Sequence, residues 1–141
     1  MNNKTIIFIV IFIAGLFFIG FIMIQPKTTQ ISEQETTDFA TLTSSQLAEM
    51  LLKKDFLFVN VHMPYAGEIE NTDAFIPYDK LADNLAQLPK DKNAKIVLYC
   101  RSGRMSELAA RELAQLGYTQ VSHLSGGMID WQKNGYEIIK K

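Results

Sequence analysis

The chain has 141 residues, with 14 lysine and arginine residues against 15 aspartate and glutamate residues, and a formal net charge of −1. This near balance argues against a protein that binds nucleic acid by neutralising phosphates. Apolar residues make up 48% of the chain, which excludes wholesale disorder. A single cysteine excludes an intrachain disulfide and a zinc site built from several thiolates, and the 2 histidines are too far apart in sequence to favour an imidazole metal site.

A long apolar run occupies the start of the chain. Residues 5–24 carry no charge, and as a helix they would span about 30 Å, the thickness of a bilayer core. The alternative is a cleaved secretory signal, but the run exceeds the usual signal core and no small-residue cleavage motif follows it. We therefore expect a single-pass transmembrane signal-anchor over residues 1–24 and a polar linker over residues 25–39. The short N-terminal tail predicts that the rest of the protein lies on the extracytoplasmic side of the cell membrane.

The remaining residues, 40–141, predict an α/β domain, because apolar runs of strand length alternate with stretches of helical periodicity. Thr43 and Gln46 have the spacing of a capping box, which predicts the start of the first helix. Pro89 ends the second helix, for which Asp79 is the expected cap. The predicted helices cover residues 43–54, 79–88, 105–116 and 128–133. The predicted strands cover residues 56–61, 95–99 and 121–124, in a mainly parallel sheet.

The third predicted helix is amphipathic and is expected to end at Gly117. Glu107 and Arg111 are spaced to pair on its solvent-facing side. The apolar stripe that we expect to face the core consists of Met105, Leu108, Ala109, Leu113 and Leu116.

Cys100 follows directly after a predicted strand and precedes a short loop and a helix. Backbone N–H groups of such a loop converge with the helix N-terminus where an anion would sit, which favours the nucleophilic thiolate. Arg101 and Arg104 add positive charge that would stabilise the thiolate and attract an anionic substrate. Gly103 is expected to supply a backbone geometry that a Cβ would forbid. The alternative is a buried cysteine that only fills apolar space, but the loop composition favours a reactive thiol.

The loop at residues 100–106, CRSGRMS, resembles the active-site loop of the rhodanese family of single-domain sulfurtransferases. Residues 124–131 resemble the family's L-x-G-G-x-x-x-W ending. Residues 58–62 and 67–69 occupy the places of its V-D-V-R and G-H-I patterns. The resemblance covers about residues 42–138 and implies a rhodanese-like three-layer α/β domain with a central, mainly parallel sheet.

The resemblance also implies a mechanism. Cys100 would take the outer sulfur of a donor such as thiosulfate, carry it as a persulfide, and pass it to a thiophilic acceptor such as cyanide, a small thiol or a protein. No bound cofactor or metal is implied. The substrate-binding residues would be Arg101, Ser102, Gly103, Arg104 and Met105, whose backbone amides would hold the terminal sulfur. Cysteine phosphatases of similar topology instead place an arginine six residues after the cysteine, where this chain has Ser106.

The chain departs from the family pattern along the first strand and the loop after it. Asn60 and His62 replace the usual aspartate and arginine, which predicts that a neutral pair stands in for a charged pair. Glu68 replaces the histidine of G-H-I, and this departure in the approach loop bears on substrate choice more than on the chemistry at the cysteine. His62 would emerge at the same sheet edge as Cys100. A Cys–His pair is conceivable there, although a structural replacement is favoured, and His123 is expected to be packed or half-exposed.

Three functions remain open from the sequence. The first is a membrane-anchored sulfurtransferase that handles small sulfane-sulfur compounds. The second is a non-catalytic rhodanese-like scaffold at the membrane. The third is a thiol redox sensor, which would need an intermolecular partner because the chain has a single cysteine.

Overall fold

The computed structural model describes residues 38–140, which form an α/β domain around a parallel sheet. The five strands have the order β1-β5-β4-β2-β3, and every strand pair is parallel. The strands are β1 (Ala40–Leu42), β2 (Leu57–Asn60), β3 (Ala74–Phe75), β4 (Ile96–Tyr99) and β5 (Val121–Leu124). The helices are α2 (Ser44–Leu51), the 3-10 helix η1 (Ala82–Gln87), α3 (Arg104–Gln115) and α4 (Gly127–Lys133). The predicted α/β fold with a parallel sheet is confirmed.

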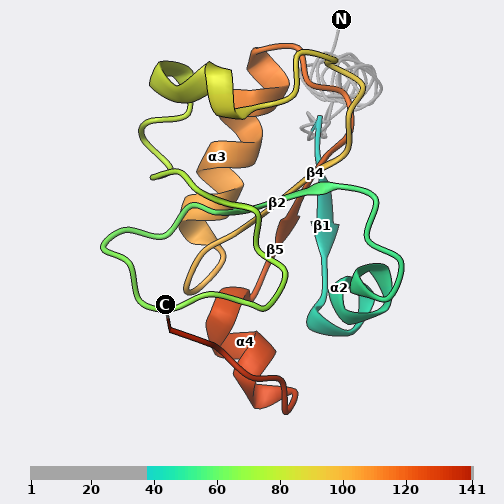
Figure 1. Cartoon of the computed structure of the whole chain (residues 1–141), viewed down its shortest axis with the longest axis vertical. Coiled ribbons are helices and arrows are strands. Elements are labelled where there is room, and N and C mark those ends of the chain that lie inside the picture. The colour runs from blue at the N-terminus through green and yellow to red at the C-terminus, as the bar shows by residue number, and fades with distance from the viewer. Residues whose placement is uncertain (1–37, 141) are drawn as a thin grey trace, which may run out of the picture. The chain divides into compact units, whose positions relative to one another are not determined.

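The sheet is covered on both faces, which gives three layers (Figure 1). On one face, α3 and the chain around η1 pack against the strands through a cluster that includes Leu81, Leu98 and Leu113. On the other face, α2 and α4 contribute Leu47 and Trp131 to a second buried cluster. Because both faces are covered, β2 and β4 are apolar along most of their length, as a doubly covered parallel sheet requires.

Two helix caps were predicted from the sequence, and the structure confirms one of them. The Thr43 hydroxyl accepts from the Gln46 backbone N–H and the Gln46 side chain accepts from the Thr43 N–H, so the predicted capping box is confirmed. The helix predicted over residues 79–88 is instead the short 3-10 helix η1, with Leu81 at its N-cap and no side-chain cap, so Asp79 does not cap it. Asn84 interrupts η1 with φ −118° and ψ 28°, and this break prevents a continuous α-helix.

Helix α3 faces the core with the predicted stripe except at Leu108: Ala109 and Leu113 are buried, and Met105 and Leu116 pack against the same cluster. Leu108 is 47% exposed, although we expected it to face the core. The buried residues of α3 are Ser106, Ala109, Ala110 and Leu113. Ser106, Ala109 and Ala110 are small, which lets the helix backbone approach the sheet closely and leaves Leu108 on the solvent side. The predicted pair of Glu107 and Arg111 is confirmed, at 3.6 Å.

The edge strands β1 and β3, which have 3 and 2 residues, were not predicted from the sequence. Both are too short and too exposed to show an apolar pattern. The predicted signal-anchor and the linker up to residue 37 lie outside the described residues. Within residues 38–140, no helix is long and apolar enough to cross a membrane. Phe39, at the end of the predicted linker, packs its ring edge-on against His123 at 5.5 Å.

Candidate active site

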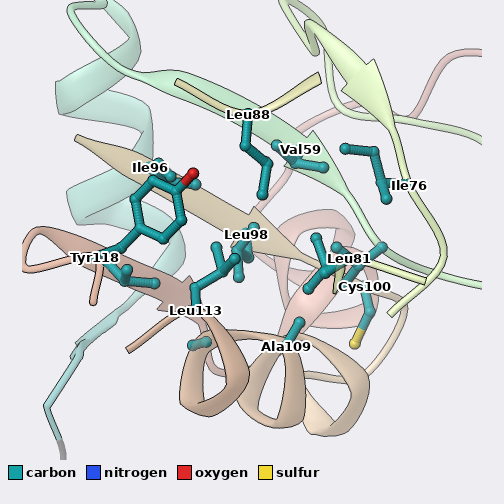
Figure 2. Packing of buried hydrophobic residues seen from close by; sticks show 13 residues of the cluster. Val59, Ile76, Leu81, Leu88, Ile96, Leu98, Cys100, Ala109, Leu113 and Tyr118 are labelled. Carbon is teal, nitrogen blue, oxygen red and sulfur yellow. The ribbon is translucent and has the colours of Figure 1, made fainter. Parts of the chain in front are cut away.

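The site is built at the carboxyl end of β4, where the chain leaves the sheet at Cys100. The Val61 N–H donates to the Tyr99 carbonyl at 2.8 Å, which fixes β4 against the continuation of β2 up to this point. Cys100 belongs to the buried cluster that packs against α3, and its sulfur lies next to the helix (Figure 2). The thiol is 1% exposed and Sγ accepts a hydrogen bond from the Gly103 N–H at 3.1 Å. A backbone donor is therefore already aimed at the sulfur.

Gly103 occupies a backbone position that no other residue fits. Its φ is +94°, in the left-handed region, and it forms the N-cap of α3. A Cβ on this residue would lie 1.6 Å from the Ser125 carbonyl oxygen. The expectation that Gly103 supplies a geometry forbidden to a Cβ is confirmed. The tight turn brings the Gly103 N–H back towards Sγ.

The other predicted binding residues follow Cys100 in the loop and in the first turn of α3. Arg101, Ser102 and Arg104 are exposed and Met105 is half-buried, so both guanidinium groups are available to solutes. A groove of about 430 Å³ lies beside the loop, and its lining includes Ser102, Arg104 and Glu107. Positive charge next to a recessed sulfur suits a small anionic donor.

The position that carries arginine in cysteine phosphatases is turned inwards. Ser106 is fully buried in the first turn of α3, and its hydroxyl donates to the Gly103 carbonyl at 2.9 Å. An arginine there could not occupy the same space and could not reach a phosphate without remaking the loop. The loop therefore lacks the arginine with which cysteine phosphatases hold a phosphate group.

Comparisons with known proteins place this geometry in a family. The family model described as the rhodanese-like domain matches residues 44–134. The chain belongs to the rhodanese-like domain family. A protein named sulfurtransferase from Allochromatium vinosum is 36% identical over 90 residues, which cover 61% of this chain and 80% of that protein.

Two further relatives differ in how much of their length matches this chain. A tRNA uridine(34) hydroxylase from Erwinia tasmaniensis is 32% identical over 104 residues, but the match covers 70% of this chain and only 30% of that protein. The crystal structure of a rhodanese-like domain protein from Staphylococcus aureus is 29% identical, with a TM-score of 0.60 over 72% of this chain and 99% of that one. The rhodanese-like fold is thus shared with both small proteins and a longer enzyme.

The departures of this rhodanese-like domain from its family pattern lie at the end of β2 and on the loop after it. The Asn60 side chain donates to the Gly67 carbonyl at 3.0 Å and accepts from the His62 backbone N–H at 3.0 Å. The predicted neutral pair of side chains is therefore wrong, because Asn60 holds two backbone groups and leaves the imidazole out. A short asparagine reaches its own loop, so no side-chain partner is needed.

The His62 imidazole is near enough to the cysteine loop to be influenced by the charge of Arg101. Burial lowers its pKa, and the nearby positive charge of Arg101 lowers the pKa further. Its Nδ1 atom is buried and has no hydrogen-bond partner among the described residues. The imidazole is consequently neutral near pH 7 and adds no positive charge to the site.

Tyr99, just before the cysteine, anchors the loop that follows β2. Its hydroxyl oxygen accepts from the Ile69 N–H at 3.0 Å and lies 2.7 Å from the Thr72 hydroxyl, which itself donates to the Ile69 carbonyl. Since the Thr72 proton is used on Ile69, the Tyr99 proton goes to Thr72, and the three residues close a ring of hydrogen bonds. Burial is the main cause of the raised pKa of Tyr99.

A second polar network, which the sequence analysis missed, lies behind the cysteine loop. Ser106 Oγ is 3.3 Å from His123 Nδ1, and His123 Nε2 is 3.4 Å from Thr41 Oγ1. His123 is 5% exposed, so it is packed, as one of the two expectations had it. These residues come from α3, β5 and β1, and neighbouring positions in the sequence give no signal that they meet.

Proposed function

We propose that this protein is a membrane-anchored sulfurtransferase that carries sulfane sulfur as a persulfide on Cys100. The observation that carries the proposal is the sulfur itself, recessed at the carboxyl end of β4 with the Gly103 N–H 3.1 Å away. The sulfurtransferase name of the Allochromatium relative supports the reaction class. The exposed arginines, Arg101 and Arg104, support an anionic donor.

The reaction would take place in two displacements. The Cys100 thiolate attacks the outer sulfur of thiosulfate, the S–S bond of the donor breaks, and sulfite leaves with the bonding electron pair. Cys100 then holds a persulfide anion, whose charge faces the backbone donors of the loop. Cyanide or a thiolate attacks the outer sulfur, the new bond forms, and the electron pair returns to the Cys100 sulfur.

Access to the sulfur supports a slender donor. Cys100 is 1% exposed, so a reactant must present its sulfur at the end of a narrow group. Thiosulfate has this shape and carries a charge that Arg101 and Arg104 would attract. The same burial weighs against the redox-sensor alternative, since an intermolecular disulfide needs two sulfurs in direct contact. A protein acceptor would have to offer its cysteine on a protruding segment.

The reaction is tested by sulfur loading of the full-length chain in detergent. Thiosulfate labelled in its outer sulfur should transfer about one label to each wild-type chain, and Cys100→Ser should take up none. Failure of the wild-type chain to take up label would contradict the proposal. Unchanged cellular function in Cys100→Ser would favour the non-catalytic scaffold instead.

The membrane part of the proposal rests on the uncharged residues 5–24. Its test uses a cysteine placed at an exposed position, because Cys100 is too buried for a bulky reagent. Leu52 is 83% exposed, so Leu52→Cys in a Cys100→Ser background gives one accessible thiol. Labelling by an impermeant maleimide on intact cells would place the domain outside the cytoplasm. Labelling only after lysis would contradict that orientation.

A further inference from the structure

The polar network behind the cysteine loop has a single consistent arrangement of protons. Ser106 has one hydroxyl proton, and it goes to the Gly103 carbonyl at 2.9 Å. In the 3.3 Å contact between Ser106 and His123, the serine oxygen is therefore the acceptor and Nδ1–H the donor. Nε2 is then unprotonated and accepts from the Thr41 hydroxyl at 3.4 Å. Each group donates a hydrogen bond to the next, in the order Thr41, His123, Ser106 and the Gly103 carbonyl.

The surroundings of His123 are consistent with this neutral tautomer. The ring is 5% exposed and packs edge-on against Phe39. Burial is the largest influence on the pKa of His123 and lowers it, while the charge of Glu107 and a hydrogen bond to the Gly103 backbone act in the opposite direction. Arg111, on the same helix as Glu107, lies over the Phe39 ring and pairs with Glu107. The imidazole thus stays uncharged at neutral pH and keeps both nitrogens occupied.

The last residue of the network, Gly103, also donates a hydrogen bond to the Cys100 sulfur. The Gly103 carbonyl accepts from both the Ser106 hydroxyl and the Glu107 N–H, the latter at 3.0 Å. These two donors fix the position and tilt of Gly103, whose own N–H donates to Cys100 Sγ at 3.1 Å. A shift of the Gly103 residue would move its N–H away from the place where negative charge sits during sulfur transfer.

We propose that Ser106 and His123 are positioning residues for the cysteine loop, which hold Gly103 so that its N–H remains directed at the Cys100 sulfur. This inference rests on the proposed sulfur transfer, and it assigns to two buried polar residues a role beyond packing. Thr41 sets the tautomer of His123 from β1. A fully buried serine and histidine, without such a role, would be costly compared with apolar residues of similar size.

The test uses matched variants of the full-length chain. His123→Asn keeps an N–H donor at the position of Nδ1, whereas His123→Leu removes it at a similar volume. Ser106→Ala removes the hydroxyl that reaches Gly103. We expect His123→Leu and Ser106→Ala to lower the maximum rate of sulfur loading about tenfold at an unchanged half-saturating thiosulfate concentration, and His123→Asn to retain most of that rate.

Two outcomes would overturn the proposal. The first is an equal loss of rate in His123→Asn and His123→Leu, which would show that only packing matters. The second is a loading rate within twofold of wild type in Ser106→Ala. Thermal unfolding of each variant is measured alongside, so that rates are compared at temperatures where every chain is folded.

An independent measurement keeps this inference separate from the sulfurtransferase proposal. Nitrogen-15 spectra of the wild-type chain should show His123 protonated on Nδ1, the less common tautomer, and protonation on Nε2 would contradict the network. If the wild-type chain loads no sulfur, the proposed function fails. The inference is then judged by this tautomer and by the alkylation rate of Cys100, which should differ between His123→Asn and His123→Leu in the same direction as loading.

Discussion

Gly127 packs directly on the backbone of Cys100. A Cβ added to Gly127 would lie 2.4 Å from the Cys100 carbonyl oxygen and 2.6 Å from the carbonyl carbon of Arg101. The N–H groups of Met128 and Ile129 donate to the carbonyls of Cys100 and Arg101 at 2.9 and 3.0 Å. Gly127, the first residue of α4, is therefore part of the support of the cysteine loop, because the start of α4 and the loop are hydrogen-bonded backbone to backbone.

Gly127→Ala should damage both stability and sulfur transfer. The residue has φ +58°, and its new methyl group would push against the loop backbone, so we expect a loss of roughly 3 kcal/mol in the free energy of unfolding. Gly135→Ala is the matched control, since Gly135 has φ +85° but no atom within 4 Å of the added Cβ. It should cost only about 1 kcal/mol and leave the loading rate unchanged. Equal effects of the two variants in urea unfolding would contradict the close packing of Gly127.

Tyr99→Phe should destabilise the domain by opening the hydrogen-bond ring to the loop after β2. The Ile69 N–H and the Thr72 hydroxyl would lose a buried partner, at a cost of about 2 kcal/mol. Tyr118→Phe is the comparison, because Tyr118 is 3% exposed and its hydroxyl makes a hydrogen bond to the Pro89 carbonyl at 2.8 Å. That variant should cost about 1 kcal/mol. A Tyr99→Phe chain as stable as Tyr118→Phe would argue against the ring.

The parts of the fold that the sequence predicted are those with strong local patterns. Residues 96–99 are apolar throughout because this strand is covered on both faces, and the pattern predicts the strand without knowledge of its neighbours. The capping box of Thr43 and Gln46 is equally local. The strands β1 and β3 depend on neighbours far along the chain, as the pairing of Thr41 with His123 shows, and a local pattern cannot reveal them.

The candidate site also contains some residues that the local sequence predicts and others that it does not. Cys100, Gly103 and the arginines are contiguous in sequence, so motif and spacing could predict them. The contact of Ser106 with His123 joins residues 17 positions apart on different elements, and no periodic pattern in the sequence predicts it. The hydrogen bonds of Asn60 could not be predicted, because the sequence indicates which side chains are present but not that a short amide can bond its own loop.

The stability of the domain should fall as the pH drops below 6.5, the ordinary pKa of histidine. Burial lowers the pKa of both His62 and His123 in the folded chain. Below pH 6.5 the unfolded chain therefore binds more protons than the folded chain. The free energy of unfolding decreases as the pH falls, until the pH is below the folded-state pKa values. Urea unfolding at several pH values from about 7.5 to about 5, which includes the ordinary histidine pKa, would measure this slope.

The control for this slope is the double variant His62→Gln, His123→Asn, which contains no histidine because the chain has 2 in all. Its stability should depend less steeply on pH between 6.5 and about 5, where carboxylates are the remaining titrating groups. An unchanged slope would show that neither imidazole is held in its neutral form by the fold.

Arg104→Gln should weaken the use of an anionic donor more than that of a neutral one. Arg104 is exposed beside Gly103 and lines the groove next to the loop, so its charge should act on an approaching anion through solvent. We expect the half-saturating concentration of thiosulfate to rise about fivefold at low salt, equivalent to about 1 kcal/mol, and the difference to shrink as ionic strength rises. An uncharged persulfide donor should show no such change. Lys90→Gln is the control, because Lys90 is an exposed cation before β4, at the opposite edge of the sheet from Cys100. An equal effect of Lys90→Gln would mean that net charge, and not the placement of Arg104, governs donor binding.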